Sequence, residues 1–248
     1  WQQLRLRRVW LRDITIMTMI AIMQPAYLPW MGYMAMVDRV DRFVFLDNVQ
    51  FDRRSWQQRN RIKSADGETM LTIPVRKKGR RNQHINEVEI DTVQDFAIRH
   101  IRSIEHAYAR APFYNRFAPD LFDQLTTTAE LLVDVTIPVI GWLLRQFAID
   151  TDCVCASALD VPGQKDALLC GISQQLDADI YLSPPGAANY LDQSDVFQDA
   201  GISVRYHAYE HPIHTQTNGE FRPFMGAIDL LFNCGPDDGL EILRKGVQ

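Results

Sequence analysis

Short apolar stretches alternate with helix-like stretches along this chain, and this alternation constrains its fold more than any other feature. Residues 20–23 predict a buried strand, residues 31–40 have helical spacing, and residues 43–47 predict a second apolar strand that ends in a carboxylate. A strand, a helix and a further strand form a βαβ unit, in which the strands pair in parallel through a right-handed crossover. The chain is therefore expected to be an α/β protein.

Three later stretches, residues 152–156, 179–182 and 202–206, also predict strands separated by helical segments. Such a pattern is typical of a mainly parallel sheet with helices on both faces, in the manner of HUP or Rossmann-like folds. Residues 48–68 are predicted as a polar, arginine-rich loop. Residues 70–75 predict a strand, which Pro74 favours placing at the edge of a sheet.

We expect one α/β domain over residues 19–248, with a helical insertion at about 93–149. Residues 1–18 are interpreted as an N-terminal extension outside the fold, with translation starting at Met17 or Met19. No apolar run reaches the roughly 20 residues needed to cross a bilayer, so no membrane span is predicted. Four cysteines without a disulfide framework favour a reducing compartment, and we infer a cytoplasmic location.

Charge is unevenly placed along the chain. The net charge is −5, yet residues 53–81 contain ten Lys or Arg and two acidic residues. A basic patch on an acidic protein favours an anionic small-molecule substrate over general nucleic-acid binding. No Walker loop, Gly-x-Gly-x-x-Gly or Gly-x-Ser-x-Gly motif is present, and no cysteine or histidine spacing predicts a metal site.

Three polar segments carry candidate site residues. In a parallel sheet, loops after the first two strands lie at the carboxyl edge, where ligands bind. The first loop contains Gln24, Tyr27, Trp30, Gly32 and Tyr33; the alternative is an aromatic plug over the core. The second segment contains Asp47 and Gln50, for which the alternative is a capping role. The third contains Arg59, Asn60 and Arg61, for which the alternative is a solvated basic loop.

The histidines of the chain divide into two groups. His211 is interpreted as a proton-transfer residue, since histidine is the side chain whose ordinary pKa lies nearest neutrality. His207, His211 and His214 are also considered as metal ligands, but no cysteine or carboxylate completes a recognisable spacing. His84, His100 and His106 are predicted to face solvent.

Motifs from residue 20 to residue 235 together resemble the WbqC-like family, which occurs in bacterial surface-polysaccharide and O-antigen gene clusters. The N-terminal ones are Gln24-Pro-x-Tyr-x-Pro-Trp-x-Gly-Tyr33, Asp47-x-Val-Gln-Phe51, Trp56-Gln-x-Arg-Asn-Arg-Ile62 and Leu71-Thr-Ile-Pro-Val75. The later ones are Tyr181-Leu-Ser183, Gly186-Ala187, Tyr190-Leu-Asp192, His211-Pro212, Gln216 and Asp229-Leu-Leu-Phe-Asn-x-Gly235. The resemblance implies a transferase of a glycyl, other aminoacyl or acyl group to an amino sugar.

A second resemblance concerns the first turn. Trp30-x-Gly-Tyr33 is similar to the His-x-Gly-His turn of HUP-fold nucleotidyltransferases and adenylate-forming ligases, and residues 45–51 resemble a segment of pantothenate synthetases. This resemblance implies bound nucleotide, either ATP or a sugar nucleotide, with Arg59 or Arg61 supplying the positive charge that the replaced imidazoles lack.

These observations lead to a specific expectation for the site. The transferase would use His211 or Asp47 as the base; the rival function is non-catalytic binding of a nucleotide or glycan precursor, and a nucleotidyltransferase or ligase is a further alternative. One pocket is predicted to be lined by Gln24, Tyr27, Trp30, Tyr33, Asp47, Gln50 and Arg59. The late residues expected to close it are Ser183, Gly186, His211 and Gln216, and Tyr190 is a further candidate for substrate binding.

Overall fold

The computed structural model describes residues 17–53, 55–80 and 82–248, so the predicted extension lies almost entirely outside the described residues. Its larger sheet has five strands in the order β5-β2-β1-β6-β7. The strands are β1 Met19–Met23, β2 Arg42–Phe45, β5 Asp152–Cys155, β6 Ile180–Ser183 and β7 Ser203–Tyr206. All four pairings are parallel, which confirms the predicted α/β class.

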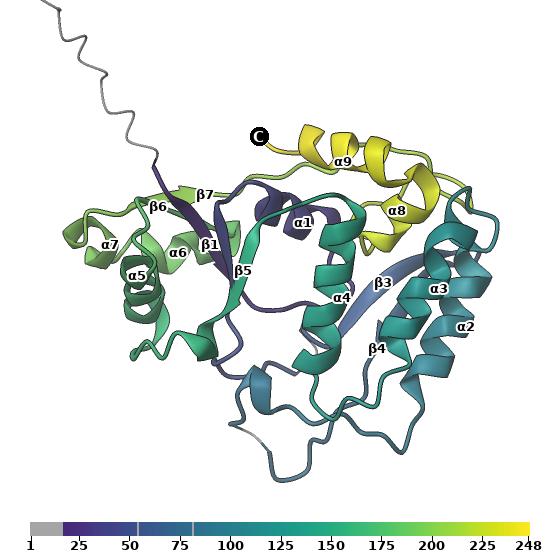
Figure 1. Cartoon of the computed structure of the whole chain (residues 1–248), viewed down its shortest axis with the longest axis horizontal. Coiled ribbons are helices and arrows are strands. Elements are labelled where there is room, and N and C mark those ends of the chain that lie inside the picture. Colours follow the sequence, from purple (N-terminus) through teal and green to yellow (C-terminus); the bar gives the residue numbers. More distant parts are fainter. Residues whose placement is uncertain (1–16, 54, 81) are drawn as a thin grey trace, which may run out of the picture.

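Helices cover both faces of this sheet (Figure 1). On one face, Ile20 and Ile22 of β1 pack with α5 (Lys165–Gln175) and α7 (Val196–Asp199). On the other, Ala21 belongs to the core that includes α1 (Met31–Asp38), α4 (Val133–Gln146), α8 (Ile228–Cys234) and α9 (Pro236–Lys245). Alternation of β1 side chains between two apolar layers explains why its sequence is apolar throughout.

A separate antiparallel hairpin is formed by β3 (Arg59–Ser64) and β4 (Gly67–Thr72). The prediction of a loop over residues 48–68 is wrong for β3. Its charged residues resemble those of a loop, but they alternate with the buried Asn60 and Ile62 of a strand. The predicted edge strand at 70–75 is displaced: β4 ends at Thr72, before Pro74, and does not join the larger sheet.

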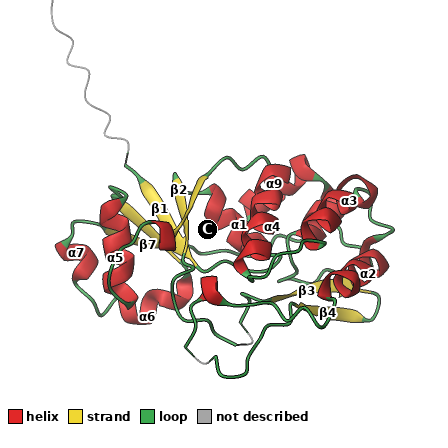
Figure 2. Ribbon diagram, turned by 60° about the horizontal axis from the view of Figure 1, so that its bottom comes forward, coloured by secondary structure: helices red, strands yellow, loops and turns green. Residues whose placement is uncertain are grey.

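The predicted helical segment contains α2 (Phe96–Tyr108), α3 (Tyr114–Leu125) and α4. α2 begins where the Asp95 side chain accepts a hydrogen bond from the Ile98 N–H, a common N-terminal cap. α2 lies over the β3–β4 hairpin, and α3 packs against both α2 and α4, beside the five-stranded sheet (Figure 2). Their apolar faces belong to the same core as α1, so the hairpin side and the sheet side share one buried cluster.

Short elements complete the fold: η1 (Ile85–Glu87), η2 (Ala156–Ala158), η3 (Pro185–Ala187) and α6 (Ala188–Leu191). Within the part of the chain that the structure describes, every helix is too short or too polar to cross a membrane.

Candidate functional site at the carboxyl edge of the sheet

The order of the parallel strands defines a switch point between β1 and β6. After β1, the chain adds β2 and then β5 on one side of β1. It then returns to the other side of β1, where it adds β6 and then β7. In open parallel sheets, ligands bind in the crevice beyond the carboxyl ends of the strands at such a point. A cavity of about 270 Å3 lies here, where Gln24 follows β1 and Pro184 follows β6.

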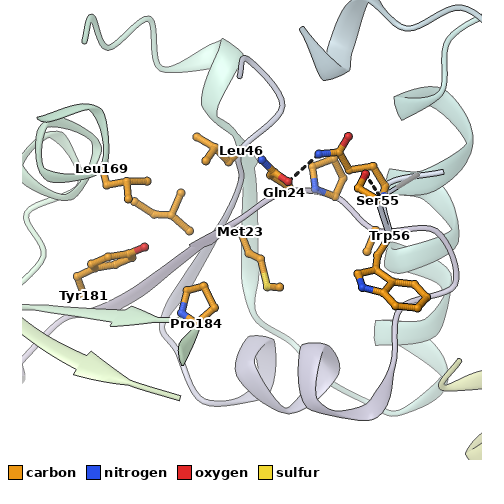
Figure 3. Close-up of a pocket in the computed structure, with 12 residues that line it drawn as sticks. Met23, Gln24, Leu46, Ser55, Trp56, Leu169, Tyr181 and Pro184 are labelled. Atoms are coloured by element: carbon orange, nitrogen blue, oxygen red, sulfur yellow. Dashed lines mark hydrogen bonds between the residues drawn. The ribbon is translucent and has the colours of Figure 1, made fainter. Parts of the chain in front are cut away.

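The switch-point cavity has a polar side and an apolar side (Figure 3). Gln57 Nε2 donates to Gln24 Oε1 at 2.6 Å, and the Gln57 N–H donates to Ser55 Oγ at 3.3 Å. Leu169 and Tyr181 lie across Met23 from these groups in Figure 3. The full lining is Ile22, Met23, Gln24, Pro25, Ala26, Leu46, Ser55, Trp56, Gln57, Leu169, Tyr181 and Pro184.

Two aromatic residues of the first loop are buried beneath the site and do not line this cavity. Tyr27 is fully buried and its hydroxyl is 2.8 Å from His100 Nδ1, while the Tyr33 hydroxyl donates to the Gln24 carbonyl at 3.3 Å. The expectation that Tyr27 and Tyr33 line the pocket is therefore wrong, and so is the exposed position predicted for His100. The loop folds back under β3, where the Asn60 amide donates to the Leu28 carbonyl at 2.6 Å.

Trp30 has a different position in the same loop. It precedes α1 and is partly exposed, and its ring lies over Gly32 so closely that a Cβ on Gly32 would be 2.1 Å from ring carbons. Gly32 is thus the residue that permits this aromatic position. Trp30 lines a second cavity of about 340 Å3, together with Trp56, Asn60, Arg61 and Phe224.

Asp47 and Gln50 do not reach either cavity. The Asp47 carboxylate is buried and accepts hydrogen bonds from the Ser157 N–H at 2.9 Å and the Ser157 hydroxyl at 2.6 Å. This geometry fits the capping alternative, because both carboxylate oxygens are occupied at the start of η2. Gln50 is exposed and its backbone forms a β-bridge with His84.

The two arginines of β3 lie beside Trp56, a side chain that lines both cavities. The guanidinium carbons of Arg59 and Arg61 are 5.8 Å and 5.1 Å from the Trp56 ring centroid, within the range of cation–π attraction. Arg61 also forms an ion pair with Glu68 at 2.8 Å, whereas no described carboxylate pairs with Arg59. Arg59 is consequently the less neutralised of the two cations. The expectation that it lines the pocket is wrong, because Arg59 lies beside Trp56 and lines neither cavity.

The later candidates separate in space. Ser183 is buried and its hydroxyl donates to the Pro184 carbonyl at 3.2 Å, while Gly186 in η3 borders open space. Tyr190 lies in α6, and its side chain is outside the described residues. Gln216 is occupied on both sides of its amide: it donates to the Arg222 carbonyl and accepts from the Arg222 N–H.

His211 lies directly behind the second cavity. Its ring centroid is 5.0 Å from that of Trp30 and 4.2 Å from that of Phe224, and its Nε2 is buried without a described protein partner. Burial lowers the pKa of His211 to about 4, with the nearby His214 adding to the effect. At neutral pH the imidazole is therefore unprotonated and able to accept a proton, but a pKa of about 4 also makes it a weaker base than an ordinary histidine.

A buried polar cluster lies next to His211, and its Asp229 was not among the predicted site residues. Asp229 Oδ2 accepts from Gln216 Nε2 at 2.7 Å and lies 3.2 Å from His214 Nε2, with the His214 and Asp229 side chains each 2% exposed. Lys63 is also buried; this burial lowers its pKa, and the negative charge of Asp229 opposes the shift. Among the described residues, no group of three acidic, histidine or cysteine side chains is arranged to hold a metal ion.

These features define a parallel α/β protein with a cavity at the switch point of its sheet and an aromatic, cationic cavity beside it. The chain belongs to the WbqC-like protein family, which matches residues 24–240 and confirms the resemblance found in the sequence motifs. It is 32% identical over 236 residues to the uncharacterized protein Rv1507c of Mycobacterium tuberculosis, a match that covers 92% of this chain and 100% of the mycobacterial one. No solved structure matches the chain.

The buried histidines predict a pH-dependent stability. Burial is the main cause that lowers the pKa of His100, His207 and His211 to about 4 each, below the ordinary value near 6.5 that an unfolded chain restores. The unfolded state therefore binds protons first as the pH falls, and the free energy of unfolding should decrease from pH 6.5 towards pH 4. Urea titrations at half-unit intervals would measure this slope.

The control for this experiment is the exposed His84. His84→Gln should leave the slope unchanged, whereas His207→Gln should flatten it, since it removes one of the three buried groups. A free energy of unfolding that is constant between pH 6.5 and pH 5 would contradict the assignment of these imidazoles as neutral.

Proposed function

We propose that this WbqC-like protein is a cytoplasmic transferase of bacterial surface-polysaccharide biosynthesis. It moves an aminoacyl group, glycyl in the simplest case, or another acyl group to the amine of an amino sugar or sugar nucleotide. The single observation that supports this proposal most is the cavity at the β1–β6 switch point, the position at which parallel α/β proteins bind nucleotides and their phosphates.

In this proposal the switch-point cavity takes the nucleotide-linked substrate. Gln24, Ser55 and Gln57 supply polar contacts, and Trp56 supplies an exposed aromatic face. Arg59 binds phosphate, because a guanidinium makes charge-assisted and often bidentate hydrogen bonds with it. Basic residues of the segment 53–81 favour the approach of such an anion.

His211 is the proposed base. The neutral amine attacks the acyl carbonyl carbon and forms the amide bond, the activating group leaves with the electrons of its bond to that carbon, and His211 accepts the amine proton. The buried, unpartnered Nε2 of His211 supports this role. Asp47 is the weaker candidate, because Ser157 already occupies both of its oxygens.

A rival function is binding without catalysis, and two measurements separate it from the transferase. A thermal-shift screen with ATP, UDP-linked amino sugars and amino acids should first reveal a ligand, because a ligand that binds only the native state raises the midpoint. With that ligand, His211→Gln should retain binding and lose turnover of the amino sugar to its amide, measured by mass spectrometry. Asp47→Asn serves as the comparison: it is expected to lower stability rather than turnover alone. Ligand binding by the unaltered protein without any amide product would favour the rival.

A further inference from the structure

The second cavity is built by three segments that are far apart in the chain. Trp30 comes from the loop before α1, Asn60 and Arg61 from β3, and Phe224 from the loop before α8. Trp56 belongs to this cavity and to the switch-point cavity at the same time. Groups bound in the two cavities would therefore meet at this side chain.

Phe224 combines an unfavourable backbone conformation with a half-exposed aromatic side chain. Its φ is 63°, in the left-handed region that is unfavourable for a residue with a side chain, and half of the residue is exposed. A large apolar side chain held in a strained backbone at the rim of a cavity suggests a contact with something else. Phe224 and Trp30 pack against each other, with ring centroids 5.9 Å apart, and together form the aromatic wall of the cavity.

The polar groups of this cavity favour an anion on the ligand. Arg61 contributes a guanidinium whose Nη1 pairs with Glu68, while its Nε is buried and has no acceptor among the described residues. A buried N–H without a partner is costly, so it favours an acceptor from a ligand. Asn60 fixes the wall rather than binding, because its amide is occupied by the Leu28 carbonyl and the Arg61 N–H.

The sizes of the two cavities indicate how they are shared. Ligand sites usually occupy about 300–1,000 Å3. The switch-point cavity and the second cavity, at about 270 Å3 and 340 Å3, each lie at the lower limit and suit one chemical moiety rather than a whole sugar nucleotide. Two such cavities that share Trp56 are suited to two ligands bound at once.

We propose that the second cavity binds a pyranose that carries an anionic group, and that it does so while a nucleotide occupies the switch-point cavity. The apolar faces of a pyranose pack against aromatic rings, and its phosphate or carboxylate pairs with Arg61. This inference rests on the proposed function, since it assigns the amino-sugar acceptor to a separate site in which His211 lies behind the aromatic walls.

Isothermal titration with two probes tests the proposal. Glucosamine 6-phosphate represents the sugar ligand and UDP represents the nucleotide. Phe224→Ala should lower the affinity for glucosamine 6-phosphate at least tenfold and change the affinity for UDP by less than twofold. Gln24→Ala should lower the affinity for UDP and leave the affinity for glucosamine 6-phosphate unchanged. Val93→Ala is the matched control, because it truncates an apolar side chain that is 91% exposed and lines neither cavity.

Saturating UDP should not displace glucosamine 6-phosphate. Competition between the probes, a loss of UDP binding in Phe224→Ala, or no binding of the sugar phosphate to the unaltered protein would overturn the inference. If UDP does not bind but glucosamine 6-phosphate binds and depends on Phe224, the nucleotide-dependent transferase is contradicted while the ligand assigned to the second cavity stands.

Discussion

Asp229→Ala should destabilise the protein by about 1–3 kcal/mol, the cost of leaving buried hydrogen-bonding groups without their acceptor. The Asp229 carboxylate accepts from Gln216 Nε2 and lies against His214 Nε2 in a region closed to solvent. Its negative charge also opposes the fall in the pKa of the buried Lys63. Without it, the amide and the imidazole lose an acceptor, and the Lys63 ammonium loses its compensating charge.

Urea denaturation of Asp229→Ala beside Asp120→Ala would measure this effect. Asp120 is an exposed aspartate on α3, so its truncation should change the free energy of unfolding by less than about 0.5 kcal/mol. Asp229→Asn keeps the shape and removes the charge, and should fall between the two. Equal stability of the two alanine variants would show that the buried cluster does not depend on this carboxylate.

Arg59→Ala should weaken a phosphorylated ligand of the switch-point cavity by about 2 kcal/mol, roughly thirtyfold in affinity. Arg59 lies beside Trp56 and no described carboxylate neutralises it, so its full charge is available to phosphate. Arg61→Ala should lower the affinity for this ligand less than Arg59→Ala does, because Glu68 already pairs with the Arg61 guanidinium. Arg59→Lys should restore part of the affinity, since lysine keeps the charge and loses the planar fork.

Titration calorimetry with UDP and uridine at two ionic strengths separates these contributions. Arg59→Ala should leave the affinity for uridine unchanged. Its effect on the affinity for UDP should become smaller at high salt only to the extent that the guanidinium is solvated. Equal, small effects on UDP and uridine would instead assign the basic segment to a solvated surface.

Local sequence pattern predicted the parallel sheet correctly because β1, β2 and β6 contain short apolar runs and helical segments separate the strands. The same reasoning failed for β3, whose Arg59, Arg61 and Lys63 resemble a solvated loop. Lys63 is buried through its position beside α2 and below the loop at Gly219, whose carbonyl accepts from its ammonium at 3.0 Å. No local pattern predicts such a burial.

The candidate site shows the same division. The motif Gln24-Pro-x-Tyr-x-Pro-Trp-x-Gly-Tyr33 pointed to a functional loop at the end of β1, and Gln24 and Trp30 do line cavities. The motif did not distinguish them from Tyr27 and Tyr33, whose hydroxyls are hydrogen-bonded inside the core. Aromatic residues with polar tips suit both positions, and only the path of the loop under β3 separates them.

The sequence by itself determined the α/β class, the βαβ start, the family and the edge of the sheet at which polar loops gather, because strand, helix and turn preferences act over a few residues. The tertiary structure alone decided which side chains face a ligand. Asp47 accepts a hydrogen bond from Ser157, which is 110 residues away in the chain, and the Phe224 ring packs against that of Trp30. Such pairings depend on how distant elements pack against one another, since burial and hydrogen-bond partners are properties of the whole fold rather than of any segment.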